Sequence, residues 1–327
     1  MTQDNNHGRV RRAMVLGAMA AAALPAARAQ SGKPLRIVVP FPPGGSADIL
    51  ARAVGNKLGP ALGQTVVIEN KPGAGGSMGA AEAARAEADG NTLLMGHVGT
   101  LAVNPSIYPR LAYDPLKSFV PVAFVARVPN ILVVNANSPV RTLADLVAKA
   151  RAQPGRLTYS SGGNGSAAHI TFEYLKLRAK FFMLHIPYRG TAPSVTDLLS
   201  GQVDATFTGA PVVLPHVRSG RLRALAVSSP QRLASLPEVP TVAESGFPGF
   251  DADQWYGFVA PAGTPAAAVA RLNAEINKIL QTPAVAEQLA TEGAIPTPTS
   301  PQAFGDLIAR EIPRWAEVVK AGNVKAD

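Results

Sequence analysis

Apolar residues follow two patterns along this chain, and the patterns predict where strands and helices form. Short continuous apolar runs are typical of strands that are buried on both faces. Between these runs, as in Ile49–Leu58 and Leu143–Val147, apolar residues fall on one face of a helix. The runs expected to form strands are Leu35–Phe41, Thr65–Asn70, Thr92–His97, Val122–Val134, Leu157–Ser160, Met183–Tyr188, Ala205–Thr208, Leu222–Val227 and Gly257–Ala260.

The alternation of strand and helix patterns indicates an α/β protein with largely parallel sheets. The run Val122–Val134 is long for one strand and contains Arg127 and Pro129, so it forms either two strands or one strand that crosses between lobes. Residues 228–253 are rich in Pro and Gly, which indicates a loop. Two or three helices are expected after the segment Trp255–Pro261.

The length of 327 residues suggests two domains and is ample for a buried core. The 47% of hydrophobic residues and the 16% of charged residues exclude intrinsic disorder. The absence of cysteine excludes disulfides, a thiol nucleophile and cysteine-based metal sites. The simplest assembly places residues 31–130 and 254–327 in lobe one and residues 131–253 in lobe two.

The N-terminus, residues 1–29, is predicted to be an export signal rather than part of the fold. Three arginines precede the apolar run Ala13–Leu24, which is too short to span a bilayer. The small-x-small sequence Ala27–Ala29 is a cleavage site, so the chain is expected to be cut near Ala29 and to begin at Gln30. A pair of adjacent arginines leaves both the Sec and the twin-arginine export route open.

Removing the predicted signal changes the charge only modestly. The signal holds four Arg and one Asp, which leaves 27 basic against 21 acidic residues. A nucleic-acid-binding protein concentrates such a surplus on one element among aromatic residues, whereas here it is spread along the chain. The sequence therefore predicts no nucleic-acid partner, and it indicates a soluble protein with a mild attraction for anions.

A glycine-rich turn, Phe41–Ser46, follows the first predicted strand and opens a helix. Its two glycines let the backbone approach a ligand closely, and Ser46 is expected to cap the helix. The free N–H groups at such a helix start favour a carboxylate or a phosphate. Asp48 and Arg52 are one helical turn apart, so an ion pair on the helix surface is expected between them.

A second turn of the same kind, Ser160–Ser166, opens the predicted helix Ala167–Arg178. His169 lies one turn inside this helix, where it bonds either a ligand or the turn. Either glycine turn alone is equally consistent with an ordinary connection. One such turn in each lobe predicts a cleft whose two anion-binding sides face each other. A third glycine loop, Lys71–Ser77, borders the same cleft or is structural, and Tyr188 at a strand end is a further cleft candidate.

Two enzyme motifs are matched in part, and neither is completed. Gly163–Ala168 fits a dinucleotide-binding pattern, but the acid that binds the ribose is missing about 20 residues further on. Gly75–Gly79 fits the nucleophile-elbow pattern around Ser77, but it stands well after the preceding strand and no Asp/His pair follows. The histidines lack metal-ligand spacing and no P-loop occurs, so neither a metal nor a cofactor is expected.

A series of short motifs covers almost the whole chain beyond the predicted signal. They are Ile37–Gly45 with Asp48 and Ala51-Arg52, Glu69–Gly76, Ser160–His169, Pro187–Gly190 with Pro193, Asp197–Asp204, Leu222–Val227, Val239–Thr241, and Trp255–Pro261 with Gly263–Pro265. Each motif is weak alone, but the series in this order is specific. It resembles the tripartite tricarboxylate transporter substrate-binding proteins, the TctC or Bug (Bordetella uptake gene) family.

The resemblance implies a two-lobed periplasmic binding protein fold of type II, with the ligand cleft between the lobes and no enzyme activity. It implies that the turns Phe41–Ser46 and Ser161–Ser166 hold a small carboxylate, partly through waters. The segments 97–100 and 206–210 would then set selectivity. Neither Val98–Thr100 nor Thr208–Ala210 carries a charge, so the far side of the ligand is expected to be neutral or aromatic. The residues expected to contact the ligand are Phe41, Gly44, Gly45, Ser46, Thr100, Ser161, Gly163, Asn164, Gly165, Ser166, His169, Tyr188, Thr208 and Gly209.

The resemblance further implies a monomeric periplasmic protein that delivers its carboxylate to the membrane subunits of a tripartite tricarboxylate transporter. Two alternatives stay open. One is a periplasmic sensor subunit that presents the ligand to a membrane receptor. The other is an exported hydrolase with Ser77 or Ser161 as nucleophile, which the incomplete motifs disfavour.

Overall fold

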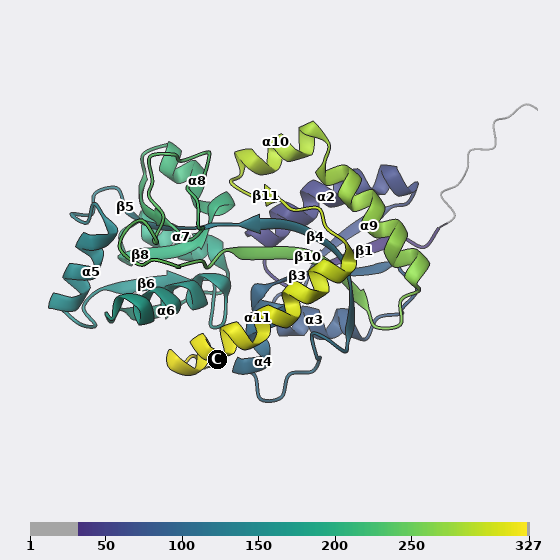
Figure 1. The fold of residues 1–327 in the computed structure, drawn as a ribbon, viewed down its shortest axis with the longest axis horizontal. Helices are drawn as coiled ribbons and strands as arrows, with labels where there is room; N and C mark the ends of the chain where they lie inside the picture. Colours follow the sequence, from purple (N-terminus) through teal and green to yellow (C-terminus); the bar gives the residue numbers. More distant parts are fainter. Residues whose placement is uncertain (1–31, 326–327) are drawn as a thin grey trace, which may run out of the picture. The chain divides into compact units, whose positions relative to one another are not determined.

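The strands form two separate sheets (Figure 1) in a computed structural model that describes residues 32–325. The strands of the first sheet are β1 (Leu35–Val39), β2 (Val66–Asn70), β3 (Thr92–His97), β4 (Phe119–Val128), β10 (Gln254–Pro261) and β11 (Ile295–Pro296). The strands of the second sheet are β5 (Asn130–Asn135), β6 (Thr158–Ser161), β7 (Leu184–Pro187), β8 (Ala205–Gly209) and β9 (Leu222–Val227). Their orders are β11-β4-β10-β3-β1-β2 and β7-β6-β8-β5-β9.

Each sheet packs with its own set of helices. We call the first sheet with its helices lobe one and the second sheet with its helices lobe two. The helices of lobe one are α2 (Ser46–Leu62), α3 (Ser77–Ala84), α4 (Asn104–Ile107), α9 (Ala266–Leu280), α10 (Pro283–Thr291) and α11 (Pro301–Ala321), with the short turns η2 (Ala74–Gly76) and η3 (Gly99–Val103). The helices of lobe two are α5 (Leu143–Ala152), α6 (Ala167–Ala179), α7 (Thr191–Leu199) and α8 (Ala210–Arg218). The predicted α/β class with two lobes is confirmed, while the residue limits of the lobes stay a prediction. Among residues 32–325, no helix has the length and apolar character that a membrane crossing requires.

The expectation of largely parallel sheets is wrong, because the ladders formed by β5 and β10 are antiparallel. β1 is parallel to β2 and β3, and β6 is parallel to β7 and β8. In contrast, β10 is antiparallel to β3 and β4, and β5 is antiparallel to β8 and β9. Continuous apolar runs indicate burial on both faces and do not encode strand direction, so the sequence pattern could not distinguish the two cases.

The chain crosses between the sheets at the interruption in the long apolar run. Of the two possibilities for Val122–Val134, the structure has two strands, since β4 ends at Val128 and β5 begins at Asn130. Pro129 between them has no N–H to donate to a ladder, and its carbonyl accepts a hydrogen bond from Ala210 N at 3.0 Å. The chain returns through residues 228–253, which hold no helix or named strand, as expected of a loop.

Strand β10 lies at the centre of the lobe-one sheet, and all of its residues are buried. Its Phe258 is fully buried and packs in one apolar cluster with Leu50 of α2 and Ile276 of α9. The core of lobe one therefore depends on large side chains that β10 inserts between the sheet and these helices.

We expect Phe258→Ala to lower the free energy of unfolding by about 3–5 kcal/mol, because it removes a buried ring and leaves a cavity. The measurement is urea unfolding followed by circular dichroism. Leu116→Ala is the control, since Leu116 is 53% exposed and its truncation should cost less than about 0.5 kcal/mol. Equal losses for the two variants would contradict the assignment of Phe258 to the core.

Candidate functional site

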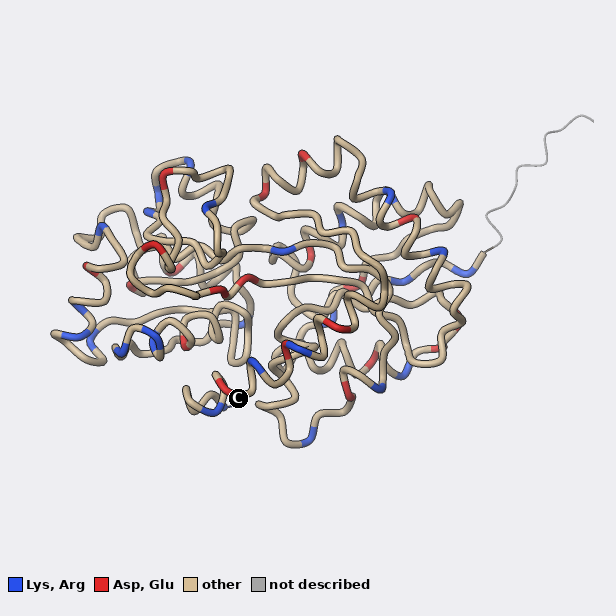
Figure 2. Tube along the Cα trace, in the orientation of Figure 1, with Lys and Arg blue, Asp and Glu red and all other residues tan. Residues whose placement is uncertain are grey.

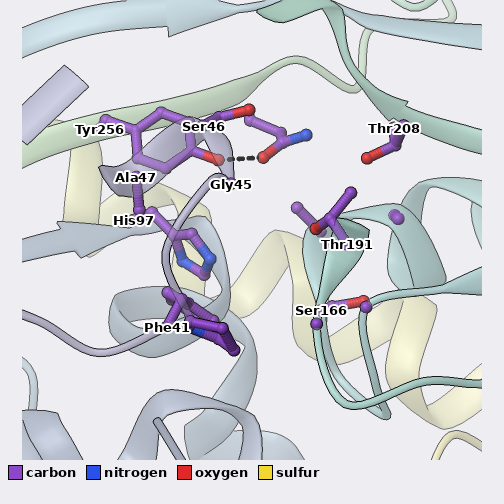
Figure 3. Close-up of a pocket in the computed structure, with 15 residues that line it drawn as sticks. Phe41, Gly45, Ser46, Ala47, His97, Ser166, Thr191, Thr208 and Tyr256 are labelled. Atoms are coloured by element: carbon purple, nitrogen blue, oxygen red, sulfur yellow. Dashed lines mark hydrogen bonds between the residues drawn. The ribbon is translucent and has the colours of Figure 1, made fainter. Parts of the chain in front are cut away.

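The N-terminal ends of three helices meet at a cavity between the two lobes, and several of their residues are labelled in Figure 3. Helix α2 of lobe one contributes Gly45–Ala47 to the lining. From lobe two, α6 contributes Ser166–Ala168, α7 contributes Gly190 and Thr191, and Thr208 lies two residues before α8. The first N–H groups of a helix have no partner within that helix. The cavity is therefore surrounded by backbone donors from both lobes.

The described residues that line the cavity include no Lys, Arg, Asp or Glu. The charged residues are instead scattered over both lobes (Figure 2). The positive ends of the helix dipoles consequently supply the electrostatic field of the cavity, which favours an anion over a cation. The cavity volume is about 40 Å³, room for a few water-sized groups. The lining residues outside the helix ends are Phe41, Pro42, His97, Gly162, Gln254 and Tyr256.

The first glycine turn places the start of α2 at the cavity. Helix α2 begins at Ser46 with Gly45 as its N-cap, so the expected cap by the Ser46 side chain is wrong. Gly44 has a φ of 81° and donates its N–H to Asp48 Oδ2 at 3.0 Å. Burial acts to raise the pKa of Asp48, but hydrogen bonds led by that from Arg52 outweigh it and lower the pKa. The ionised carboxylate thus holds the turn, and the predicted ion pair of Asp48 with Arg52 is confirmed at 2.9 Å.

The second glycine turn is held by its own side chains. Ser166 Oγ accepts a hydrogen bond from His169 N at 3.3 Å and so caps α6. Gly165 N donates to His169 Nδ1 at 3.1 Å, and burial lowers the pKa of His169 to about 2, so its ring is neutral. Gly163 and Gly165 have φ angles of 125° and 71°, values that favour glycine. Of the two roles considered for His169, the structure shows the bond to the turn.

The two lobes touch each other around the cavity. At Gly209 of lobe two, an added Cβ would lie 2.6 Å from Ser46 Oγ and 3.0 Å from Gln254 Nε2, both of lobe one. A Cβ on Gly190 would lie 3.0 Å from Pro42 Cγ across the same gap. Glycine at these two positions therefore permits the close approach of the lobes, and the structure is a closed arrangement.

One wall of the cavity is made of aromatic rings from lobe one. The ring centroids of Phe41 and His97 are 4.5 Å apart, and those of His97 and Tyr256 are 5.4 Å apart at an angle of 70°. Strands β3 and β10 pair so that Tyr256 stands opposite His97. The resemblance placed the segment of His97 at the pocket border, but sequence reasoning named neither His97 nor Tyr256 as a contact. His97 and Tyr256 come together through the antiparallel pairing of β3 with β10, and no local sequence motif predicts that pairing.

A chain of buried hydrogen bonds links the cavity to the crossing strands. The Tyr256 hydroxyl donates to Gln254 Oε1, and Gln254 Nε2 donates to Asn130 Oδ1. Asn130 Nδ2 donates in turn to the Ala252 carbonyl at 2.8 Å, and Asn130 N donates to Ser228 Oγ at 2.8 Å. The outward and return crossings of the chain are therefore tied to each other and to the cavity wall.

Some of the predicted contact residues line the cavity in this structure. Those that do are Phe41, Gly45, Ser46, Ser166 and Thr208. The others do not line it, and they are Gly44, Thr100, Ser161, Gly163, Asn164, Gly165, His169, Tyr188 and Gly209. Thr100 Oγ1, for example, accepts a hydrogen bond from His97 N at 3.1 Å, and the Tyr188 hydroxyl donates to Asp197 at 2.6 Å. As ligand contacts, all of them remain predictions.

Ser161, a candidate nucleophile, does have a histidine partner. Its Oγ lies 2.7 Å from His185 Nε2. The same Oγ accepts a hydrogen bond from Gly163 N at 3.2 Å and donates to the Gly163 carbonyl at 3.1 Å. Ser161 is fully buried, whereas a nucleophile needs contact with its substrate. The pair therefore supports the glycine turn beside the cavity.

Comparison with known proteins identifies the family. The model of the tripartite tricarboxylate transporter family receptor, TctC, matches residues 50–324, and the chain belongs to this family. Protein BugT of Bordetella pertussis is 42% identical over 294 residues, which cover 90% of each chain. The solved structure of R. palustris Rpa4515 with adipate is 36% identical with a TM-score of 0.86, over 89% of this chain and 98% of that chain. The periplasmic binding protein BugD is 35% identical with a TM-score of 0.84, over 89% and 98%.

These matches confirm the predicted family and the two-lobed binding-protein fold. The family consists of receptors, so the chain is a solute-binding protein that serves transport, and it is not an enzyme. The hydrolase alternative is thereby excluded.

Asp253, which accepts a hydrogen bond from Ser228 beside the crossing strands, gives a pH test of this region. Burial raises its pKa to about 7, and the bond from Ser228 only partly offsets this. Between pH 4 and 7 the folded state therefore holds a proton that the unfolded state has released, so this carboxyl lowers stability as pH rises. We expect Asp253→Asn to become more stable relative to the unmodified protein by about 2–3 kcal/mol between pH 5 and pH 8.

The measurement is urea unfolding of both proteins at the two pH values. Taking the difference cancels the opposite trend of the buried histidines, whose lowered pKa values make stability rise with pH in the same range. A difference between the two proteins that does not change with pH would show that the Asp253 carboxyl is ionised at pH 5.

Proposed function

We propose that this protein captures a small carboxylate between its lobes and delivers it to the membrane subunits of a tripartite tricarboxylate transporter. The observation that carries the proposal is the meeting of three helix N-termini at a cavity without a charged lining residue. Such a cavity offers backbone N–H groups and a positive field, which match the oxygens and the charge of a carboxylate.

Donors from both lobes make ligand capture and lobe closure parts of one event. The start of α2 belongs to lobe one, and the starts of α6 and α7 belong to lobe two. A carboxylate that bonds both sets of donors stabilises the closed arrangement over an open one. Closure around the ligand then gives the membrane partner a shape to recognise.

The relatives and the sequence support the same assignment. Rpa4515, which shares the fold and 36% of its residues, was solved with adipate. The predicted export signal, residues 1–29 with cleavage near Ala29, would place the protein in the periplasm; it lies outside the described residues. In this proposal the protein works as a monomer, with residues 31–130 and 254–327 as lobe one and residues 131–253 as lobe two.

We expect adipate to raise the melting temperature of the protein from Gln30 onward by a few degrees at about 100 times its dissociation constant. Binding at that concentration adds about 2.7 kcal/mol of stability, and a chain of this length converts it into a modest shift. The measurement is a thermal-shift screen of mono-, di- and tricarboxylates and aromatic acids. The matched control is adipamide, which has the same carbon chain without the charge. Equal shifts with adipate and adipamide, or none with any acid, would contradict a carboxylate site.

We expect Gly209→Ala to weaken adipate binding about tenfold, because its Cβ would meet Ser46 Oγ at 2.6 Å only when the lobes are closed. The backbone itself tolerates alanine, since Gly209 has φ −56° and ψ 137°. The measurement is isothermal titration calorimetry, with the melting temperature of the ligand-free variant as a check on folding. An unchanged affinity would show that the ligand binds without this closure.

A further inference from the structure

We propose that His97 donates a hydrogen bond from its Nε2–H to an acceptor oxygen of the ligand other than the carboxylate at the helix N-termini. This inference rests on the proposed function and names a residue that selects among small carboxylates. It makes a second oxygen, on the side of the cavity facing Ser166 and Thr191, part of what the cleft recognises (Figure 3).

The backbone around His97 fixes which ring nitrogen carries the proton. Nδ1 accepts hydrogen bonds from Gly99 N at 2.8 Å and from Thr100 N at 3.2 Å. A ring nitrogen that accepts such bonds is unprotonated, so the proton of the neutral ring sits on Nε2. Burial lowers the pKa of His97 to about 4, which keeps the ring neutral at pH 7. The side chain therefore presents one donor of fixed identity.

The packing of the ring leaves this donor facing the cavity. His97 is only 4% exposed, and it lines the cavity between Phe41 and Tyr256. The Nδ1–Cε1 edge lies against the η3 turn, because a Cβ on Gly99 would be 2.3 Å from Cε1. Within residues 32–325 the ring makes its hydrogen bonds through Nδ1, and Nε2 has no acceptor. An N–H that lines a cavity without a partner in the protein is stabilised by an acceptor oxygen, which a bound molecule can supply.

The position of His97 in the cavity indicates that it bonds an oxygen of the ligand other than the carboxylate at the helix N-termini. The backbone donors for a carboxylate stand at the starts of α2, α6 and α7, whereas His97 ends β3 within the aromatic wall. An acid with one carboxylate and a hydrocarbon tail would bury Nε2–H against carbon and leave it unpaired. A site built around a hydrogen bond rejects the analogue that lacks the partner by about tenfold or more.

The test compares two acids of equal length on two variants of one residue. Adipate carries a second carboxylate where hexanoate ends in a methyl group. In His97→Asn, the amide Oδ1 can occupy the place of Nδ1 and accept from Gly99 and Thr100, but the amide is too short to reach the position of Nε2. His97→Gln has the length to restore a donor there. Dissociation constants come from isothermal titration calorimetry at pH 7.

We expect His97→Asn to lose about tenfold in adipate affinity and to bind hexanoate as the unmodified protein does, while His97→Gln recovers most of the adipate affinity. A merely structural role would move both acids alike, because both meet the same folded protein. An adipate affinity of His97→Asn within twofold of the unmodified protein would overturn the proposal. An equal loss for both acids would place the donor on the first carboxylate and also overturn it.

A second measurement needs no ligand and separates the two proposals. A long-range ¹H–¹⁵N spectrum of the ligand-free protein reports which nitrogen of His97 is protonated. We expect the Nε2–H form, and a proton on Nδ1 would overturn the assignment of the donor. Failure of every acid to bind the unmodified protein, with the Nε2–H form present, would count against the carboxylate function alone.

Discussion

The cavity has no cationic side chain in its lining and is surrounded by the N-termini of α2, α6 and α7, and this arrangement organises the molecule. One terminus supplies a partial charge of roughly half a unit, so a single helix is a weak substitute for an arginine. The helices α2, α6, α7 and α8 directly follow β1, β6, β7 and β8, so the cavity lies beyond the carboxyl ends of strands from both sheets. This is the general position of ligands in α/β sheets. In this protein the carboxyl ends of strands from two sheets face the same cavity.

The link between the lobes is polar. In the proposed function the lobes separate and close, and the two crossings of the chain pass side by side at Asn130 and Ser228. Asn130 bonds both the other crossing and Gln254 of the cavity wall. The energy of an apolar contact there would change little if one lobe rotated slightly relative to the other. A buried hydrogen-bond network depends more strongly on the relative orientation of its groups. The cavity wall is therefore joined to both crossings of the chain by these hydrogen bonds.

The two glycine turns could be predicted because their signals are local in the sequence. The other cavity residues could not, because they depend on pairing between distant segments. Glycines followed by a helix pattern predict the turns Phe41–Ser46 and Ser160–Ser166, and the structure places parts of both turns at the cavity. His97, Gln254 and Tyr256 carry no such signal, because they reach the cavity through the antiparallel pairing of β3 and β10. Gly165 lies in the predicted turn and His169 in the helix that follows it, but the sequence could not distinguish residues that line the cavity from residues that support the turn. The signal of strand direction was missing for the same reason: apolar runs record burial alone.

Neutral donors also bear on release, which a delivery protein needs as much as capture. An arginine in one lobe would keep much of its attraction for a carboxylate after the lobes separate, because its charge stays with that lobe. Helix N-termini act within about one turn of their ends and are weakened by water. With α2 in one lobe and α6 and α7 in the other, opening both divides the donors and admits solvent. In the proposed function, a partner that favours the open form therefore separates the backbone donors and so weakens ligand binding. It does not have to overcome the attraction of a charged side chain that stays in one lobe.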